Sequence, residues 1–116
     1  MKILVVDDEK IISSALQRIL SRSGHEVQVA NHGVEALKLV EDAPAAYDYC
    51  FVDLLMPEIS GSTVLDAIKK KMPGANVFMM TAYGDMAVRE DLLKRGALRV
   101  LAKPFDDIMK IPELLK

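Results

Sequence analysis

Apolar positions along the chain follow two alternating spacings. Five short runs are rich in apolar residues and have the length of strands, and the segments after them repeat apolar residues every three or four positions, like the buried face of a helix. The predicted strands are residues 3–6, 26–30, 49–52, 77–80 and 98–102, and a last helical segment runs toward Lys116. This alternation predicts an α/β fold in which helices cover both faces of a parallel sheet.

The composition of each run predicts its place in the sheet. Runs 3–6, 49–52 and 77–80 are continuously apolar, as buried central strands are, whereas run 26–30 alternates and run 98–102 carries Arg99, as edge strands do. This fits a doubly wound (βα)5, flavodoxin-like sandwich with strand order 2-1-3-4-5. The chain then reverses direction between strands 1 and 3, and ligands of such sheets bind at that point, at the carboxyl ends of the strands.

Short polar side chains indicate where the helices begin. Asn31 can cap the second helix, Ser60 or Ser62 the third, and Asp85 the fourth. Pro112 interrupts the last helical segment, because proline removes a hydrogen bond from a helix and kinks it. We therefore expect either that the fifth helix is short and irregular or that the chain is cut from a longer protein.

Composition narrows the class of protein. The 116 residues suit one domain, and a hydrophobic fraction of 51% with only 5% aromatic residues predicts an aliphatic core. The formal charge of -2 gives no reason to expect nucleic acid as a partner, and no apolar run has the length of a membrane span. The single Cys50 lies in a predicted buried strand, which indicates a core position and excludes an internal disulfide or a cysteine-based zinc site. A cytoplasmic location is expected.

Acidic residues gather at the predicted switch point. Asp7, Asp8 and Glu9 follow the first strand and Asp53 ends the third, so that their carboxylates meet at one edge of the sheet. Carboxylates this close repel one another unless a cation neutralises them, and oxygen ligands without histidine or cysteine favour Mg²⁺. Glu9, taken alone, is interpreted as a negative charge that stabilises the first helix by lying at its positive N-terminal end.

The same edge carries groups that suit an anion. Thr81 ends the fourth strand and Lys103 follows the fifth, which adds a hydroxyl and an ammonium to the acidic residues. A metal site beside an anion site indicates phosphoryl chemistry. Asp53 is then a candidate nucleophile that forms an aspartyl-phosphate.

Four motifs at the strand ends resemble the receiver domains of two-component response regulators, the CheY-like superfamily. They are "VVDDE" at 5–9, "FVDLLMPEISG" at 51–61, "MTAYGD" at 80–85 and "GALRVLAKPF" at 96–105. The resemblance spans essentially the whole chain. It implies that Asp53 accepts a phosphoryl group from a histidine kinase or phosphotransfer protein.

The resemblance also implies a role for the other site residues. Asp8, Asp53 and the backbone carbonyl of Leu55 would ligate Mg²⁺ directly, and Asp7 would act through a bound water. The phosphoryl oxygens would be bound by two further residues, Thr81 and Lys103, and Lys103 would pair with Asp53 before phosphorylation. The family usually has a cis peptide bond at the position of Lys103-Pro104.

The resemblance predicts a signalling switch. Phosphorylation would change the face made by helix 4, strand 5 and helix 5, which controls an output domain or a downstream partner. The domain would catalyse only its own phosphorylation and slow autodephosphorylation, and is otherwise not an enzyme. Residues 1–116 would form a single receiver domain. The resemblance is compatible with an output domain after Lys116 and with a homodimer.

The sequence departs from the family pattern at several positions. Val100 stands where the family commonly has an aromatic residue that switches rotamer. Leu55 and Tyr83 occupy positions that tune the lifetime of the phosphoryl group in the family. Leu98-Arg99 replaces the acidic pair of one large DNA-binding subfamily, so that the dimer of that subfamily is not expected here.

Other functions on this fold have weaker support. A Mg²⁺-dependent phosphohydrolase usually has a second Asp two residues after its nucleophile, where this chain has Leu55. A flavin or nucleotide binder needs a phosphate loop rich in Gly, Ser or Thr after strand 1, where this chain has Asp7-Asp8-Glu9. A pseudo-receiver that acts only through protein contacts is the remaining alternative.

Several charged and polar residues are assigned to the surface. His25 and His32 flank the edge strand at 26–30 and lack metal-ligand spacing. Lys69-Lys70-Lys71 is interpreted as a solvated helix face, with Asp66 able to pair with Lys70 four residues away.

Overall fold

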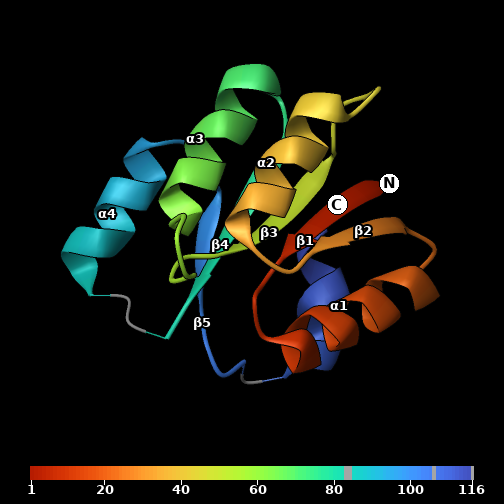
Figure 1. Ribbon diagram of the computed structural model, residues 1–116. Coiled ribbons are helices and arrows are strands. Elements are labelled where there is room, and N and C mark those ends of the chain that lie inside the picture. The colour runs from red at the N-terminus through yellow and green to blue at the C-terminus, as the bar shows by residue number, and fades with distance from the viewer. Residues whose placement is uncertain (83–84, 106, 116) are drawn as a thin grey trace.

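The structure, a computed structural model, describes residues 1–82, 85–105 and 107–115. Its sheet has five parallel strands in the order β2-β1-β3-β4-β5, as the sequence predicts (Figure 1). The central strands β1, β3 and β4 are almost wholly buried, whereas β2 and β5 are partly exposed edges. The strands are β1 Lys2–Val6, β2 Glu26–Ala30, β3 Tyr49–Asp53, β4 Asn76–Thr81 and β5 Arg99–Ala102.

Helices cover both faces of the sheet and divide the core in two. Alternate residues of β1 supply the two halves: Leu4 and Val6 pack with α2 and α3, and Ile3 and Val5 pack with α1 and the C-terminal helix η1. Figure 1 shows α2 and α3 on one face, and α1 with the blue C-terminal helix on the other. The helices are α1 Lys10–Arg22, α2 Gly33–Asp42, α3 Gly61–Lys71, α4 Met86–Lys94 and η1 Ile108–Leu114.

Two of the three predicted helix caps are confirmed, and one is wrong. Ser60 accepts a hydrogen bond at the start of α3 and Asp85 does so at the start of α4. The cap of α2 is His32, which accepts from the backbone N–H of Glu35, and not Asn31. The Asn31 side chain instead accepts a hydrogen bond from Ser13 of α1, 3.2 Å away. Histidine is an uncommon cap, so propensity alone favoured the wrong neighbour.

The last helix has the short and irregular form that Pro112 predicts. Residues 108–114 form a 3₁₀ helix that contains Pro112 and buries Ile111. Tighter 3₁₀ turns are used in short pieces, and proline contributes no N–H that would need a partner. Lys116, toward which the segment was expected to run, lies outside the described residues.

The charged surface of α3 differs from the prediction. Lys69 is not simply solvated, because its ammonium donates to the carbonyls of Pro73 and Ala75, each at 2.8 Å. Asp66 pairs with Arg95 beyond the end of α4, at 3.0 Å, rather than with Lys70. The pair links two helices, which the one-helix spacing rule does not address.

Cys50 is fully buried in β3, as predicted, and burial raises the pKa of its thiol to about 12. It is therefore a core residue that stays protonated. Within the described residues, no helix combines the length and the apolar character needed to cross a bilayer.

Candidate functional site

The sheet brings the predicted carboxylates together. Val6 of β1 lies opposite Val52 of β3, so that Asp7 and Asp53 both stand where these neighbouring strands end. One carboxylate oxygen from each of Asp7, Asp8 and Asp53 lies within 4.8 Å of the other two. Asp7 and Asp53 are buried and Asp8 is exposed. The cluster is thus closed on the core side and open to solvent through Asp8.

The buried position of Asp53 disfavours its charged form. Burial, followed by the nearby charge of Asp7, raises the pKa of Asp53 to about 7, although Lys103 opposes this shift. Without a bound cation, the three carboxylates therefore carry less than their full negative charge near neutral pH. A cation at the cluster would favour the ionised form.

Lys103 brings positive charge into the cluster from the end of β5. Its ammonium lies 3.0 Å from Asp7 Oδ2, 2.7 Å from Glu9 Oε1 and 3.5 Å from Asp53 Oδ1. Partial burial disfavours the charge of Lys103, but hydrogen bonds with Glu9 and Asp7 outweigh this and raise the pKa of Lys103 above its ordinary value. Lys103 is therefore a permanent cation beside Asp53. The peptide bond that joins it to Pro104 is cis.

Glu9 has a role that the sequence interpretation missed. It stands at the N-cap position of α1, but its side chain makes no capping hydrogen bond and binds Lys103 instead. The backbone N–H of Glu9 donates to Asp7 Oδ1 at 2.9 Å, which helps to turn the chain from β1 into α1. Glu9 and Lys103 are 94 residues apart in the sequence, so no local sequence pattern could predict this pair.

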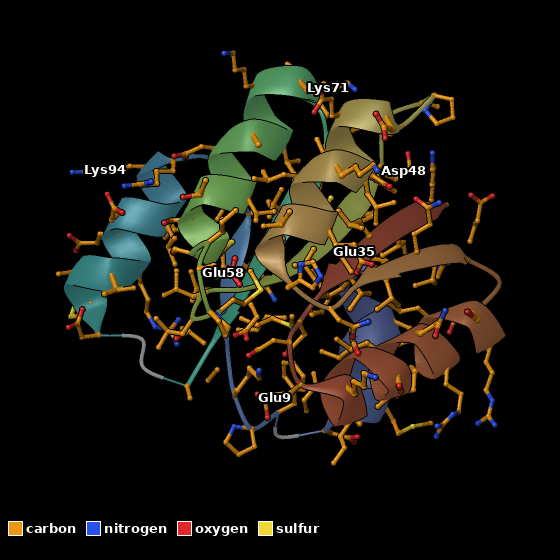
Figure 2. All side chains as sticks on the ribbon, viewed as in Figure 1. Glu9, Glu35, Asp48, Glu58, Lys71 and Lys94 are labelled. Atoms are coloured by element: carbon orange, nitrogen blue, oxygen red, sulfur yellow. The ribbon has the colours of Figure 1, made fainter. Side chains whose placement is uncertain are left out.

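Thr81 completes the edge at the end of β4, where it is buried. Beside it opens a pocket of about 340 Å³, whose lining residues are Glu9, Ile12, Asp53, Leu55, Thr81, Ala82, Lys103 and Pro104. The pocket is large enough for a small anion, and an ammonium and two carboxylates face it. Figure 2 shows Glu9 where β1 leads into α1, at this edge of the sheet. Tyr83, predicted to tune the lifetime of a phosphoryl group, lies outside the described residues.

Val100, at the position where the family pattern commonly has an aromatic residue, is partly buried in the edge strand β5. Its carbonyl accepts a hydrogen bond from Arg89 Nη1 of α4 at 3.2 Å. Met86 and Leu93 of α4 are exposed, and so is Leu98, which directly precedes β5. The α4–β5 surface therefore combines an apolar exposed part with a polar link between the two elements.

Known proteins share this sequence and this fold. The model of the response regulator receiver domain family matches residues 3–115. The transcriptional regulatory protein ZraR of Klebsiella oxytoca is 38% identical over 104 residues, which cover 90% of this chain and 23% of ZraR. The chemotaxis protein CheY of Listeria monocytogenes is 34% identical over 106 residues, which cover 90% of this chain and 87% of CheY.

Solved structures agree with the family match. A Burkholderia pseudomallei response regulator, solved with a phosphorylated aspartic acid, a calcium ion and citrate, has a TM-score of 0.87 and 30% identity, over 99% of this chain and 66% of that one. A CheY-like receiver domain from Methanospirillum hungatei has a TM-score of 0.89 and 27% identity, over 97% of this chain and 88% of that one. The chain spans less than a quarter of the length of ZraR. With its family match over nearly every residue, the chain belongs to the response regulator receiver domain family.

Proposed function

We propose that this domain is a phosphorylation-driven switch that accepts a phosphoryl group on Asp53 from a histidine kinase or phosphotransfer protein. The observation that carries the proposal is the placement of Lys103 and two carboxylates, Asp7 and Asp8, around the buried Asp53 at the edge of a pocket. Receiver domains are signalling switches. The phosphorylated aspartic acid of the Burkholderia relative supports the same chemistry here.

The acidic cluster fits a divalent cation. Its three carboxylates are hard oxygen donors close enough to share one ion, and the exposed Asp8 leaves a path for the ion to enter. Asp8, Asp53 and the backbone carbonyl of Leu55 would hold Mg²⁺ directly and Asp7 would hold it through water. When bound, Mg²⁺ supplies positive charge that offsets the charge of the carboxylates and the phosphoryl oxygens.

The transfer reaction needs the ionised form of Asp53. One carboxylate oxygen attacks the phosphorus, an O–P bond forms, and the N–P bond of the donor phosphohistidine breaks. The electron pair of that bond stays on the imidazole nitrogen, which takes up a proton from solvent. Lys103, 3.5 Å from Asp53, would donate a hydrogen bond to a phosphoryl oxygen, and Thr81, which lines the same pocket, would bind another.

The output face is proposed to be formed by α4, β5 and η1. Arg89 of α4 donates a hydrogen bond to the carbonyl of Val100 in β5, so a movement of α4 would act on this link. The exposed side chains of Met86, Leu93 and Leu98 give the face an apolar surface for an output domain or partner. With Val100 at the usual aromatic position, the response depends on movement of α4 rather than on an aromatic rotamer.

Intact-mass spectrometry after incubation with acetyl phosphate and Mg²⁺ tests the proposal. We expect one phosphoryl adduct on the parent protein and on Asp42→Ala, a control that removes an exposed carboxylate from α2. The adduct should be absent from Asp53→Ala and in the presence of EDTA. A parent protein that binds Mg²⁺ but takes up no phosphoryl group would refute the proposal and favour a pseudo-receiver.

A further inference from the structure

Lys103 is held mainly by carboxylates other than the proposed phosphoacceptor. Its shortest contact is with Glu9 at 2.7 Å, the next with Asp7 at 3.0 Å, and Asp53 is farthest at 3.5 Å. The side chain of Glu9 is 61% exposed, whereas those of Asp7 and Lys103 are 0% and 9% exposed. The ammonium is thus drawn toward an exposed acid at the edge of the pocket.

A phosphoryl group on Asp53 would compete for this ammonium. Lysine has three N–H donors, and Asp7 and Glu9 already accept two of them in hydrogen bonds. The third donor is available to a phosphoryl oxygen, but Asp53 lies 3.5 Å away, so the ammonium must shift toward it and lengthen one of its two existing contacts. Giving up Asp7 would leave a buried carboxylate without its cation, which is costly, whereas Glu9 can exchange Lys103 for water at little cost.

We infer that Glu9 is a positioning residue that restrains Lys103 and competes with the phosphoryl group for it. The unphosphorylated state keeps the Glu9–Lys103 pair, and the phosphorylated state releases Glu9 to solvent. Glu9 thereby lowers the affinity of the site for a phosphoryl group. This inference rests on the proposed function, because it assigns to Lys103 a contact with the phosphoryl group.

The binding of beryllofluoride, which stands in for the phosphoryl group on Asp53, measures this competition. In the presence of Mg²⁺ we expect Glu9→Gln to lower the Kd for beryllofluoride by about threefold to fivefold, the range of a half-exposed ion pair. Glu9→Asp keeps the charge but is one methylene shorter, so its contact with Lys103 weakens. Competition predicts that Glu9→Asp lowers the Kd as well, whereas a long-range charge effect predicts no change.

Glu58→Gln is the matched control, because it removes the same charge from an exposed acid in the loop between β3 and α3 (Figure 2). The ¹⁵N–¹H signal of the Lys103 ammonium gives a second measurement. Glu9→Gln should shift this signal in the unliganded protein, and Glu58→Gln should leave it unchanged. A role of Glu9 in stability alone would not produce this difference.

The outcomes separate this inference from the proposed function. If the parent protein binds beryllofluoride and takes up a phosphoryl group on Asp53, but Glu9→Gln has the same Kd as Glu58→Gln, the competition is refuted and the proposed function stands. If the parent protein does neither, both are refuted. A lower Kd for Glu9→Gln and Glu9→Asp, with an unchanged Kd for Glu58→Gln, supports the competition.

Discussion

At the scale of single residues, Asp53 is placed where its charge works against folding. Its pKa is raised from 3.8 to about 7 in the folded chain, so the folded state binds a proton more tightly than the unfolded state does. Without metal, the parent protein therefore loses stability as the pH rises from about 4 to about 7. Above pH 7 the loss of stability caused by the charge of Asp53 is complete.

Asp53→Asn should remove this penalty. We expect the variant to be more stable than the parent by about 2–4 kcal/mol at pH 8 without Mg²⁺, and nearly equal to it below pH 4. Chemical denaturation at a series of pH values measures the difference. Addition of Mg²⁺ should stabilise the parent but not the variant. A constant difference between pH 4 and pH 8 would mean that the pKa of Asp53 is not raised.

The sequence was sufficient to place the strand-end residues, because parallel strands bring their carboxyl ends to one edge. Asp7, Asp8, Asp53 and Lys103 come together for this reason alone. The interpretation of Glu9 failed because its partner lies on a distant strand end, while the local pattern offered a helix start. Whether two long side chains at the edge of a sheet meet depends on their rotamers, and no rule of sequence spacing specifies these.

At the scale of elements, the junction of β3 and α3 fixes the backbone around Asp53. The N–H of Gly61 donates to the carbonyl of Leu54 at 2.8 Å, and a Cβ at position 61 would lie 2.1 Å from the backbone oxygen of Asp53. Only glycine permits this close approach. The start of α3 is therefore held directly against the end of β3.

Gly61→Ala should push α3 away from β3. We expect a loss of about 1–3 kcal/mol of stability and weaker Mg²⁺ binding, because the backbone at Asp53 must shift. Gly74→Ala is the control: a Cβ there meets nothing within 4 Å, so its stability should change by less than about 1 kcal/mol. Thermal denaturation and Mg²⁺ titration measure both effects. Equal behaviour of the two variants would contradict the close approach.

At the scale of the whole molecule, the order of strands followed from which runs were continuously apolar. The same reasoning could not give the form of the last helix in detail, because Pro112 excludes a regular α-helix without specifying what replaces it. In the structure a 3₁₀ helix takes its place, and η1 joins α1 in covering one face of the sheet. Ile111 is the residue of η1 that is buried there.

Ile111→Ala tests whether this short helix is needed to close the fold. Ile111 is 6% exposed and belongs to the core half that contains Phe51 and Phe78, so its truncation should cost about 2–3 kcal/mol. Met109→Ala, in the same helix but at a position 64% exposed, should change stability by less than about 0.5 kcal/mol. Urea denaturation compares the two variants. An equally small loss in both would mean that α1 alone seals this face, whereas a large loss confined to Ile111→Ala makes residues 108–114 part of the minimal folding unit.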